Sequence, residues 1–141
     1  MLTAAGSDPT GHVLTPGDIL GLRLDSDVVV LSACRSGLGE LLRGEGLVSL
    51  TRAFLQAGSR AVVVSLWDVG DRSTADFMGA FYKGLLRGEP VAAALRGAEL
   101  SFVRSESPSR REIFRWAPFV LVGDPGVPAN ALNPAPAGST K

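Results

Sequence analysis

Residues Val28–Gly37, with the sequence VVVLSACRSG, decide the fold class of this 141-residue chain. Val28–Leu31 is too short and too rich in β-branched residues for a helix of its own, and it predicts a strand buried on both faces. Small residues and the single cysteine, Cys34, follow that strand. In an open parallel α/β sheet, ligands and reacting groups lie at the carboxyl ends of the strands. A cysteine in this position can be exposed and presented by a rigid scaffold.

A second apolar run follows after one expected helix. Apolar residues at helical spacing predict a helix from Leu47, which Gly58 ends. Ser59–Trp67 then predicts a second buried strand. A strand-helix-strand unit of this kind places its two strands parallel in one sheet.

Further signals on both sides of this unit complete the expected architecture. Thr15 and Pro16 predict the N-cap and first residue of a short helix. The other expected elements are helices from Asp71 to Gly88 and from Pro90 through Phe102, a polar loop at Ser105–Arg111 and a last strand at Phe119–Val122. We therefore expect an α/β fold, a three-layer α/β/α sandwich with a mainly parallel sheet, over residues 1–124. The Pro- and Ala-rich residues 125–141 predict a disordered tail.

Composition excludes several classes of function. The 14 basic and 14 acidic residues leave no net charge, so no nucleic-acid or anionic-membrane partner is expected. The longest apolar runs fall far short of the ~20 residues that span a bilayer, and the N-terminus lacks the features of a signal peptide, which predicts a cytoplasmic protein. One cysteine and one histidine cannot form a disulfide framework or a Cys-rich zinc site, so we expect no metal and no cofactor.

Several longer motifs occur between Leu14 and Asp124 in a fixed order: LSACRSG, RGEGL, RAFLQAGSRAVVVSLWDVGDRST, FMGAFYKGLLRG and WAPFVLVGD. This series resembles the C-terminal part of a CHAT domain, a caspase- and separase-related cysteine peptidase module often joined to tetratricopeptide repeats. The resemblance implies a caspase-like fold, a protein or peptide substrate, a bacterial source, and an N-terminal repeat or sensor region in a longer homologue.

The resemblance also changes how Cys34 is interpreted. On periodicity alone a buried free cysteine is the favoured interpretation, whereas the resemblance matches Cys34 to the family's nucleophile. The family's general-base histidine lies in an ATHG-like motif upstream of every motif found here, and the one histidine, His12, matches a variable loop position. We therefore expect an incomplete catalytic dyad and a chain that is inactive alone. The alternatives are a non-catalytic interaction or scaffold module with a caspase-like fold and, less favoured, a small-molecule binder.

Two carboxylates and an aromatic residue follow the second expected strand. Asp68 and Asp71 would suit an arginine or lysine of a substrate, and Asp71 matches a recurrent acidic position of the family. The competing interpretation, which we favour for Asp71, is an ordinary helix N-cap ahead of Ser73 and Thr74. Trp67 at the end of the strand is expected in the core or in a pocket wall.

The edge of the sheet predicts a further property. The upstream segment that the resemblance implies would also carry strands of the sheet. Without them, an apolar strand edge stays unpaired, and such an edge pairs readily with another chain. We therefore expect self-association or a requirement for a partner.

Overall fold

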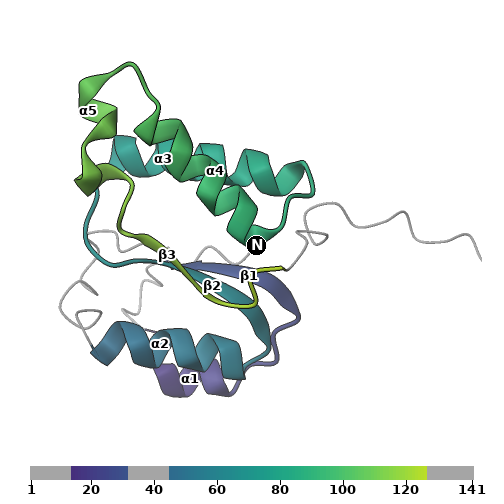
Figure 1. The fold of residues 1–141 in the computed structure, drawn as a ribbon. Coiled ribbons are helices and arrows are strands. Elements are labelled where there is room, and N and C mark those ends of the chain that lie inside the picture. Colours follow the sequence, from purple (N-terminus) through teal and green to yellow (C-terminus); the bar gives the residue numbers. More distant parts are fainter. Residues whose placement is uncertain (1–13, 32–44, 127–141) are drawn as a thin grey trace, which may run out of the picture.

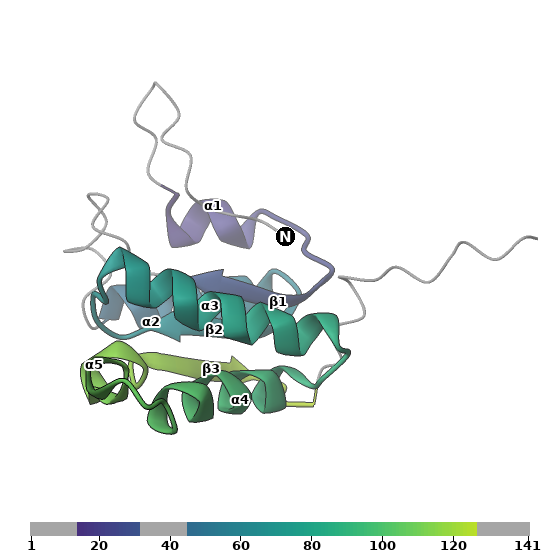
Figure 2. The ribbon, with the colours of Figure 1, turned by 90° about the horizontal axis from the view of Figure 1, so that it is seen from above.

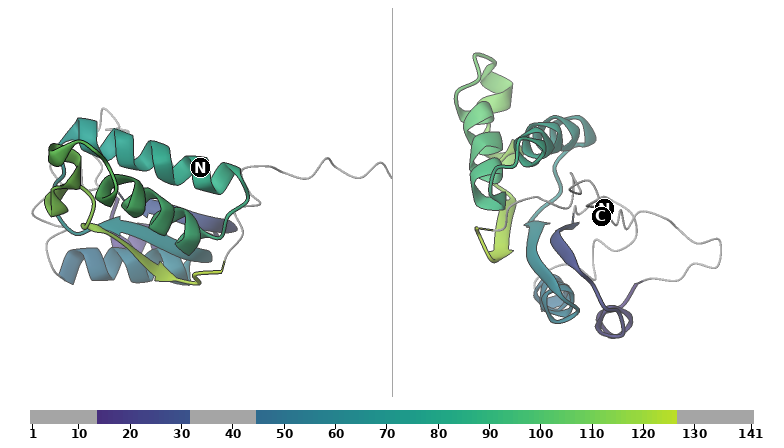
Figure 3. Two further views of the ribbon diagram at one scale, coloured as in Figure 1. Left: turned by 45° about the horizontal axis from the view of Figure 1, so that its top comes forward. Right: turned by 90° about the vertical axis from the view of Figure 1, so that its right-hand side faces the viewer.

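A computed structural model describes residues 14–31 and 45–126 of the chain. Within these ranges a three-stranded sheet lies between two layers of helices (Figure 1). The strands are β1 (Ser26–Leu31), β2 (Ser59–Ser65) and β3 (Phe119–Gly123), in the spatial order β1-β2-β3. The helices are α1 (Pro16–Leu20), α2 (Glu45–Gln56), α3 (Asp71–Leu86), α4 (Val91–Val103), α5 (Pro108–Arg111) and the 3₁₀ turn η1 (Ile113–Arg115). α1 and α2 cover one face of the sheet, whereas α3 and α4 cover the other (Figures 1 and 3).

The expected parallel pair is confirmed, and the sheet as a whole is mixed. β1 and β2 run parallel, with Val28 beside Ala61 and Leu31 beside Val64. β3 runs antiparallel to β2, so the expectation of a parallel sheet is wrong for this strand. The cause lies in the path of the chain, which enters β3 beside the carboxyl end of β2, where the Leu66 amide donates to the Pro118 carbonyl at 3.0 Å. The pattern of inward- and outward-facing residues along a strand is the same for parallel and antiparallel pairing, so the sequence could not show the direction of β3.

β2 separates two hydrophobic clusters because its side chains alternate between the two faces. Val62 and Val64 pack with residues of α1 and α2, including the fully buried Ile19. Ala61 and Val63 pack with the apolar faces of α3 and α4. Every residue of β2 except Arg60 is buried, as predicted for a strand with both faces covered.

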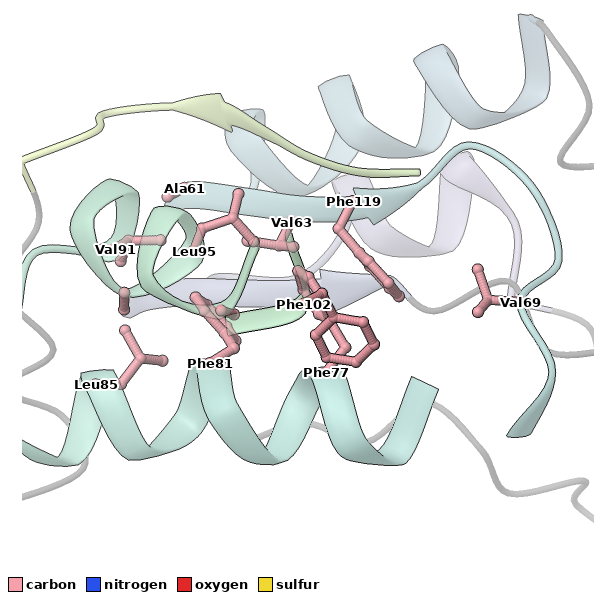
Figure 4. Packing of buried hydrophobic residues seen from close by; sticks show 12 residues of the cluster. Ala61, Val63, Val69, Phe77, Phe81, Leu85, Val91, Leu95, Phe102 and Phe119 are labelled. Carbon is pink, nitrogen blue, oxygen red and sulfur yellow. The ribbon is translucent and has the colours of Figure 1, made fainter. Parts of the chain in front are cut away.

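Three phenylalanines join the helix layer to the last strand (Figure 4). The Phe77 ring of α3 stacks on the Phe119 ring of β3 with centroids 4.1 Å apart, and it meets the Phe102 ring of α4 at 5.6 Å. All three rings are buried. Tyr82, next to Phe81 on α3, is half-buried at the margin of this cluster, and desolvation raises the pKa of its phenol.

Local sequence signals act largely as expected at α1. The Thr15 amide donates to the Asp18 carboxylate at 2.8 Å, and the Asp18 amide donates to the Thr15 hydroxyl at 3.3 Å, which completes a capping box. In contrast, the segment expected as a polar loop contains the short helix α5. Pro108 stands at its first position, where the fixed φ of proline favours a helical start.

The α3–α4 pair depends on a close approach at Gly84. A Cβ atom built on Gly84 would lie 2.8 Å from the Ala94 Cβ and 3.0 Å from the Ala94 Cα of α4. Neither contact can relax without moving a helix. Gly79, on the same helix, has no heavy atom within 4 Å of the same position.

We therefore expect the same substitution to have opposite effects at these two glycines. Gly84→Ala should lower the free energy of unfolding by about 1 to 3 kcal/mol, because it overpacks the α3–α4 contact. Gly79→Ala should raise it by up to about 1 kcal/mol, because alanine favours the helix without meeting a neighbour. Urea unfolding followed by circular dichroism measures both values. Equal stability of the two variants would contradict the close approach.

Candidate functional site

The candidate site lies at the carboxyl ends of β1 and β2. The last residue of β1, Leu31, is paired in register with Val64, one residue before the end of β2. Cys34 follows Leu31 by three residues and lies outside the described residues, as does His12. The described part of the site therefore consists of the connection from β2 to α3, the first turn of α3, and η1.

Hydrogen bonds join the connection after β2 to the end of β2 and to η1. The Ser65 hydroxyl donates to the Trp67 carbonyl at 2.6 Å. The Trp67 indole Nε1 donates to the Phe114 carbonyl at 3.1 Å, and the two rings are tilted by 52° with centroids 5.5 Å apart. The Phe114 side chain remains 69% exposed. Trp67 thus joins β2 to η1 and leaves an aromatic surface open to solvent.

Asp71 is the first residue of α3 and not its N-cap, so the expectation of a capping role is wrong. Gly70 occupies the N-cap position, and its carbonyl accepts from the Ser73 and Thr74 amides. The Thr74 hydroxyl turns back to donate to the Val69 carbonyl at 3.0 Å. Gly70 has no side chain, and α3 therefore begins without a side-chain cap.

The Asp71 carboxylate is therefore available for another role. Its side chain is exposed and forms no hydrogen bond or ion pair with residues 14–31 or 45–126. Its position in the first turn of a 16-residue helix stabilises the negative charge through the helix dipole. Asp68 is exposed as well, in the connection that precedes α3. The structure thus brings both predicted carboxylates to the carboxyl-end side of β2.

Arg115 links η1 to the first turn of α3, a contact that sequence reasoning missed. Its Nη1 donates to the buried Ser73 hydroxyl at 2.7 Å, and its Nε donates to the Glu112 carboxylate at 3.0 Å. Ser73 and Arg115 are 42 residues apart in the sequence, and no motif or spacing relates them. The link fixes η1, and with it the Phe114 ring, beside the helix that carries Asp71.

The described residues show neither a metal-binding group of side chains nor a helix suited to cross a membrane. Residues 14–31 and 45–126 contain no group of three or more histidine, cysteine, aspartate or glutamate side chains placed to hold a metal ion. Among the helices in these ranges, none has the length and apolar character needed to cross a membrane.

Comparison with known proteins gives the family. The family model of the CHAT domain matches residues 1–124. The chain belongs to the CHAT domain family. This confirms the resemblance drawn from the sequence motifs and relates the chain to caspase-like peptidases. No solved structure matches the chain, so the caspase-like form expected for its sandwich stays a prediction.

Two mammalian proteins contain a region similar to this chain. Tetratricopeptide repeat protein 28 of Mus musculus is 41% identical over 111 residues, and its Homo sapiens counterpart is 39% identical over 111 residues. The match covers 79% of this chain and 4% of each relative. The chain therefore spans only a small part of the curated proteins it matches. These relatives are mammalian, and they give no support to the expectation of a bacterial source.

The contact of Phe114 with Trp67 predicts a difference between two neighbouring exposed residues. Phe114→Ala should lower the free energy of unfolding by about 1 kcal/mol, because it removes an aromatic pair. Ile113 is 63% exposed and has no such ring contact, so Ile113→Ala should change stability by less than about 0.5 kcal/mol. Thermal and urea unfolding measure both values. Equal losses would mean that the ring contact contributes nothing.

Proposed function

We propose that this CHAT domain performs cysteine peptidase chemistry with Cys34 as the nucleophile. The observation that supports this most is the position of the LSACRSG motif, whose first residue, Leu31, ends β1. β1 is parallel to β2, and its carboxyl end is the side on which such sheets hold reacting groups. Chain connectivity limits Cys34 to within about 11 Å of Leu31. The nucleophile and the carboxylates that follow β2 would thus lie beyond the same end of the sheet.

The proposed reaction passes through an acyl-enzyme. The Cys34 thiolate attacks the carbonyl carbon of the scissile peptide, a carbon–sulfur bond forms, and the carbonyl electrons move to the oxygen. Backbone amides near Cys34 would stabilise that oxyanion. The amine leaves with a proton from a histidine, and water then hydrolyses the thioester. We place this histidine in a segment that completes the domain, in the same longer protein or in a second chain, and not at His12.

The substrate class follows from Asp68 and Asp71. Both are exposed carboxylates on the carboxyl-end side of β2, and the Asp71 side chain makes no contact with the described residues that would neutralise it. A peptide with arginine or lysine beside the scissile bond would pair with these groups. We therefore propose a basic specificity at this site, with Asp71 as its main determinant.

Peptidyl chloromethyl ketones that carry arginine or alanine test the nucleophile and the specificity together. Because Cys34 is the sole cysteine, a single adduct by mass spectrometry identifies the site. The arginine reagent should modify Cys34 faster than the alanine reagent. Asp71→Asn should reduce this preference about fivefold, the size of an exposed ion pair.

Asp76→Asn serves as the matched control, because Asp76 is an exposed aspartate on the same helix. It should leave the preference for arginine unchanged. Equal rates with the two reagents in the unmodified protein would contradict a basic specificity. A rate no higher than that of a free LSACRSG peptide would contradict a preorganised nucleophile.

The pH dependence of alkylation tests the role of His12. Without the family histidine, the Cys34 thiol should react with an apparent pKa close to the free value of ~8.5. His12→Gln should leave this pH profile unchanged. Iodoacetamide labelling from pH 6 to 10 measures both profiles. A rise in the apparent pKa on His12→Gln would identify His12 as the base and would overturn its assignment to another segment.

A second candidate function is a non-catalytic interaction module. The observation that favours it is that both curated relatives are named as tetratricopeptide repeat proteins, and repeat proteins of this class present extended binding surfaces. In that case Cys34→Ser would abolish no activity and would leave binding to a repeat partner unchanged. Loss of hydrolysis in the same variant of the completed protein would decide for the peptidase.

A further inference from the structure

Phe114 presents an exposed aromatic ring on a backbone that is held from two directions. Its carbonyl accepts from the Trp67 indole at 3.1 Å, and the two rings are in contact. The next residue, Arg115, donates to the Ser73 hydroxyl at 2.7 Å. Phe114 nevertheless stays 69% exposed, and the preceding Ile113 is 63% exposed. An apolar side chain on a fixed backbone can bind a ligand group without the cost of ordering its own segment first.

η1 lies at the same end of the sheet as the candidate site. β3 begins beside the last residue of β2, with Phe119 opposite Ser65, so the segment that precedes β3 reaches the carboxyl ends of β1 and β2. Figure 2 shows α5 and the chain that enters β3 at the end toward which β1 and β2 point. Cys34 follows β1, Asp71 follows β2, and η1 precedes β3. Across the end of the sheet, the order β1-β2-β3 therefore places the nucleophile segment, the carboxylate and the aromatic ring in succession.

The spacing of the strands matches the spacing of side chains along an extended peptide. Neighbouring strands lie about 4.8 Å apart, whereas side chains on the same side of an extended peptide lie roughly 6.6 Å apart, two residues along the chain. A peptide that crosses the strand ends with its scissile bond at β1 and its basic side chain at β2 thus brings a side chain two residues further on to the level of η1. Where the basic residue carries the attacked carbonyl, this side chain precedes it in the peptide.

We propose that the Phe114 ring binds a large apolar side chain of the peptide substrate, two residues before its arginine or lysine. The inference rests on the proposed peptidase function and adds a second specificity determinant to Asp71. An aromatic side chain fits best, because paired rings gain more than the burial of their area alone.

The polar groups around Phe114 favour an apolar occupant over a second basic one. The Trp67 indole N–H, which could otherwise bind a polar group, already donates to the Phe114 carbonyl. The carboxylate of Glu112, two residues before Phe114, is paired with the Arg115 guanidinium at 3.0 Å. A basic side chain at this place would therefore compete with Arg115 for the same carboxylate, whereas an apolar side chain needs no polar partner.

Chloromethyl ketones of Phe-Ala-Arg and Gly-Ala-Arg test the inference, because they differ only at the residue expected to meet Phe114. The Phe-Ala-Arg reagent should modify Cys34 about fivefold faster, the size of one exposed aromatic contact. Phe114→Gln should remove this difference, because it replaces the ring with a polar side chain, whereas Phe114→Leu should keep most of it. Mass spectrometry of the Cys34 adduct over time measures each rate.

Leu86→Gln is the matched control. Leu86 is 66% exposed and ends α3, about 22 Å along the helix axis from Asp71. This variant should keep the fivefold difference. Asp71→Asn should slow both arginine reagents by the same factor and leave their ratio unchanged, because the two contacts are separate. Circular dichroism verifies that each variant is folded. Equal rates of the two reagents with the unmodified chain, or a difference that survives Phe114→Gln, overturn the inference.

A binding measurement separates this inference from the peptidase chemistry. With Cys34→Ser, the amides of Phe-Ala-Arg and Gly-Ala-Arg bind without reacting, and titration followed by nuclear magnetic resonance gives each Kd. The Phe-Ala-Arg peptide should bind about fivefold tighter and shift the backbone amide resonance of Phe114. If this difference is found while Cys34 of the unmodified chain reacts no faster than a free LSACRSG peptide, the nucleophile proposal fails and the apolar site stands. Equal Kd values, or binding of neither peptide, overturn the apolar site even where Cys34 is reactive.

Discussion

The burial of β2 between two helix layers is the constraint on which the rest of the structure depends. Its valines alternate between two separate clusters, and full burial of one such side chain contributes roughly 1.5 to 3 kcal/mol. Both helix layers therefore pack against the same strand. β1 and β3 take their positions from it, one parallel and one antiparallel. The connection that leaves β2 begins the candidate site, and hydrogen bonds of Ser65 and Trp67 hold it in place.

The candidate site is assembled by the return of the chain along β3. Before entering β3, the chain passes the carboxyl end of β2 and contributes η1 to that side. Trp67 and Arg115 then fix η1 from two directions, one through the Phe114 carbonyl and one through Ser73. The antiparallel direction of β3 is thus what brings a distant segment next to the strand ends. A parallel last strand would have delivered that segment to the opposite end of the sheet.

Two surfaces are of functional interest: the outer edge of β1 and the exposed Asp71 carboxylate at the start of α3. The outer edge of β1 pairs with no strand of residues 14–31 or 45–126 and carries partly buried valines, whereas α3 begins with an aspartate that is not its N-cap. The two surfaces involve different residues and different physical forces. Strand pairing depends on backbone hydrogen bonds and apolar cover, and recognition of a basic residue depends on charge. Each can therefore be altered without the other.

The sequence by itself determined the three strands and the helices α1 to α4, because β-branched runs, helical spacing and the Thr15 cap act locally. It also determined the family and the position of Cys34 after the first strand, since the motifs occur in a fixed order. Only the tertiary structure decided the direction of β3, because alternation is the same in either direction. It alone replaced Asp71 by Gly70 at the N-cap and joined Arg115 to Ser73. The contact between Arg115 and Ser73 joins residues 42 positions apart, which no local pattern encodes.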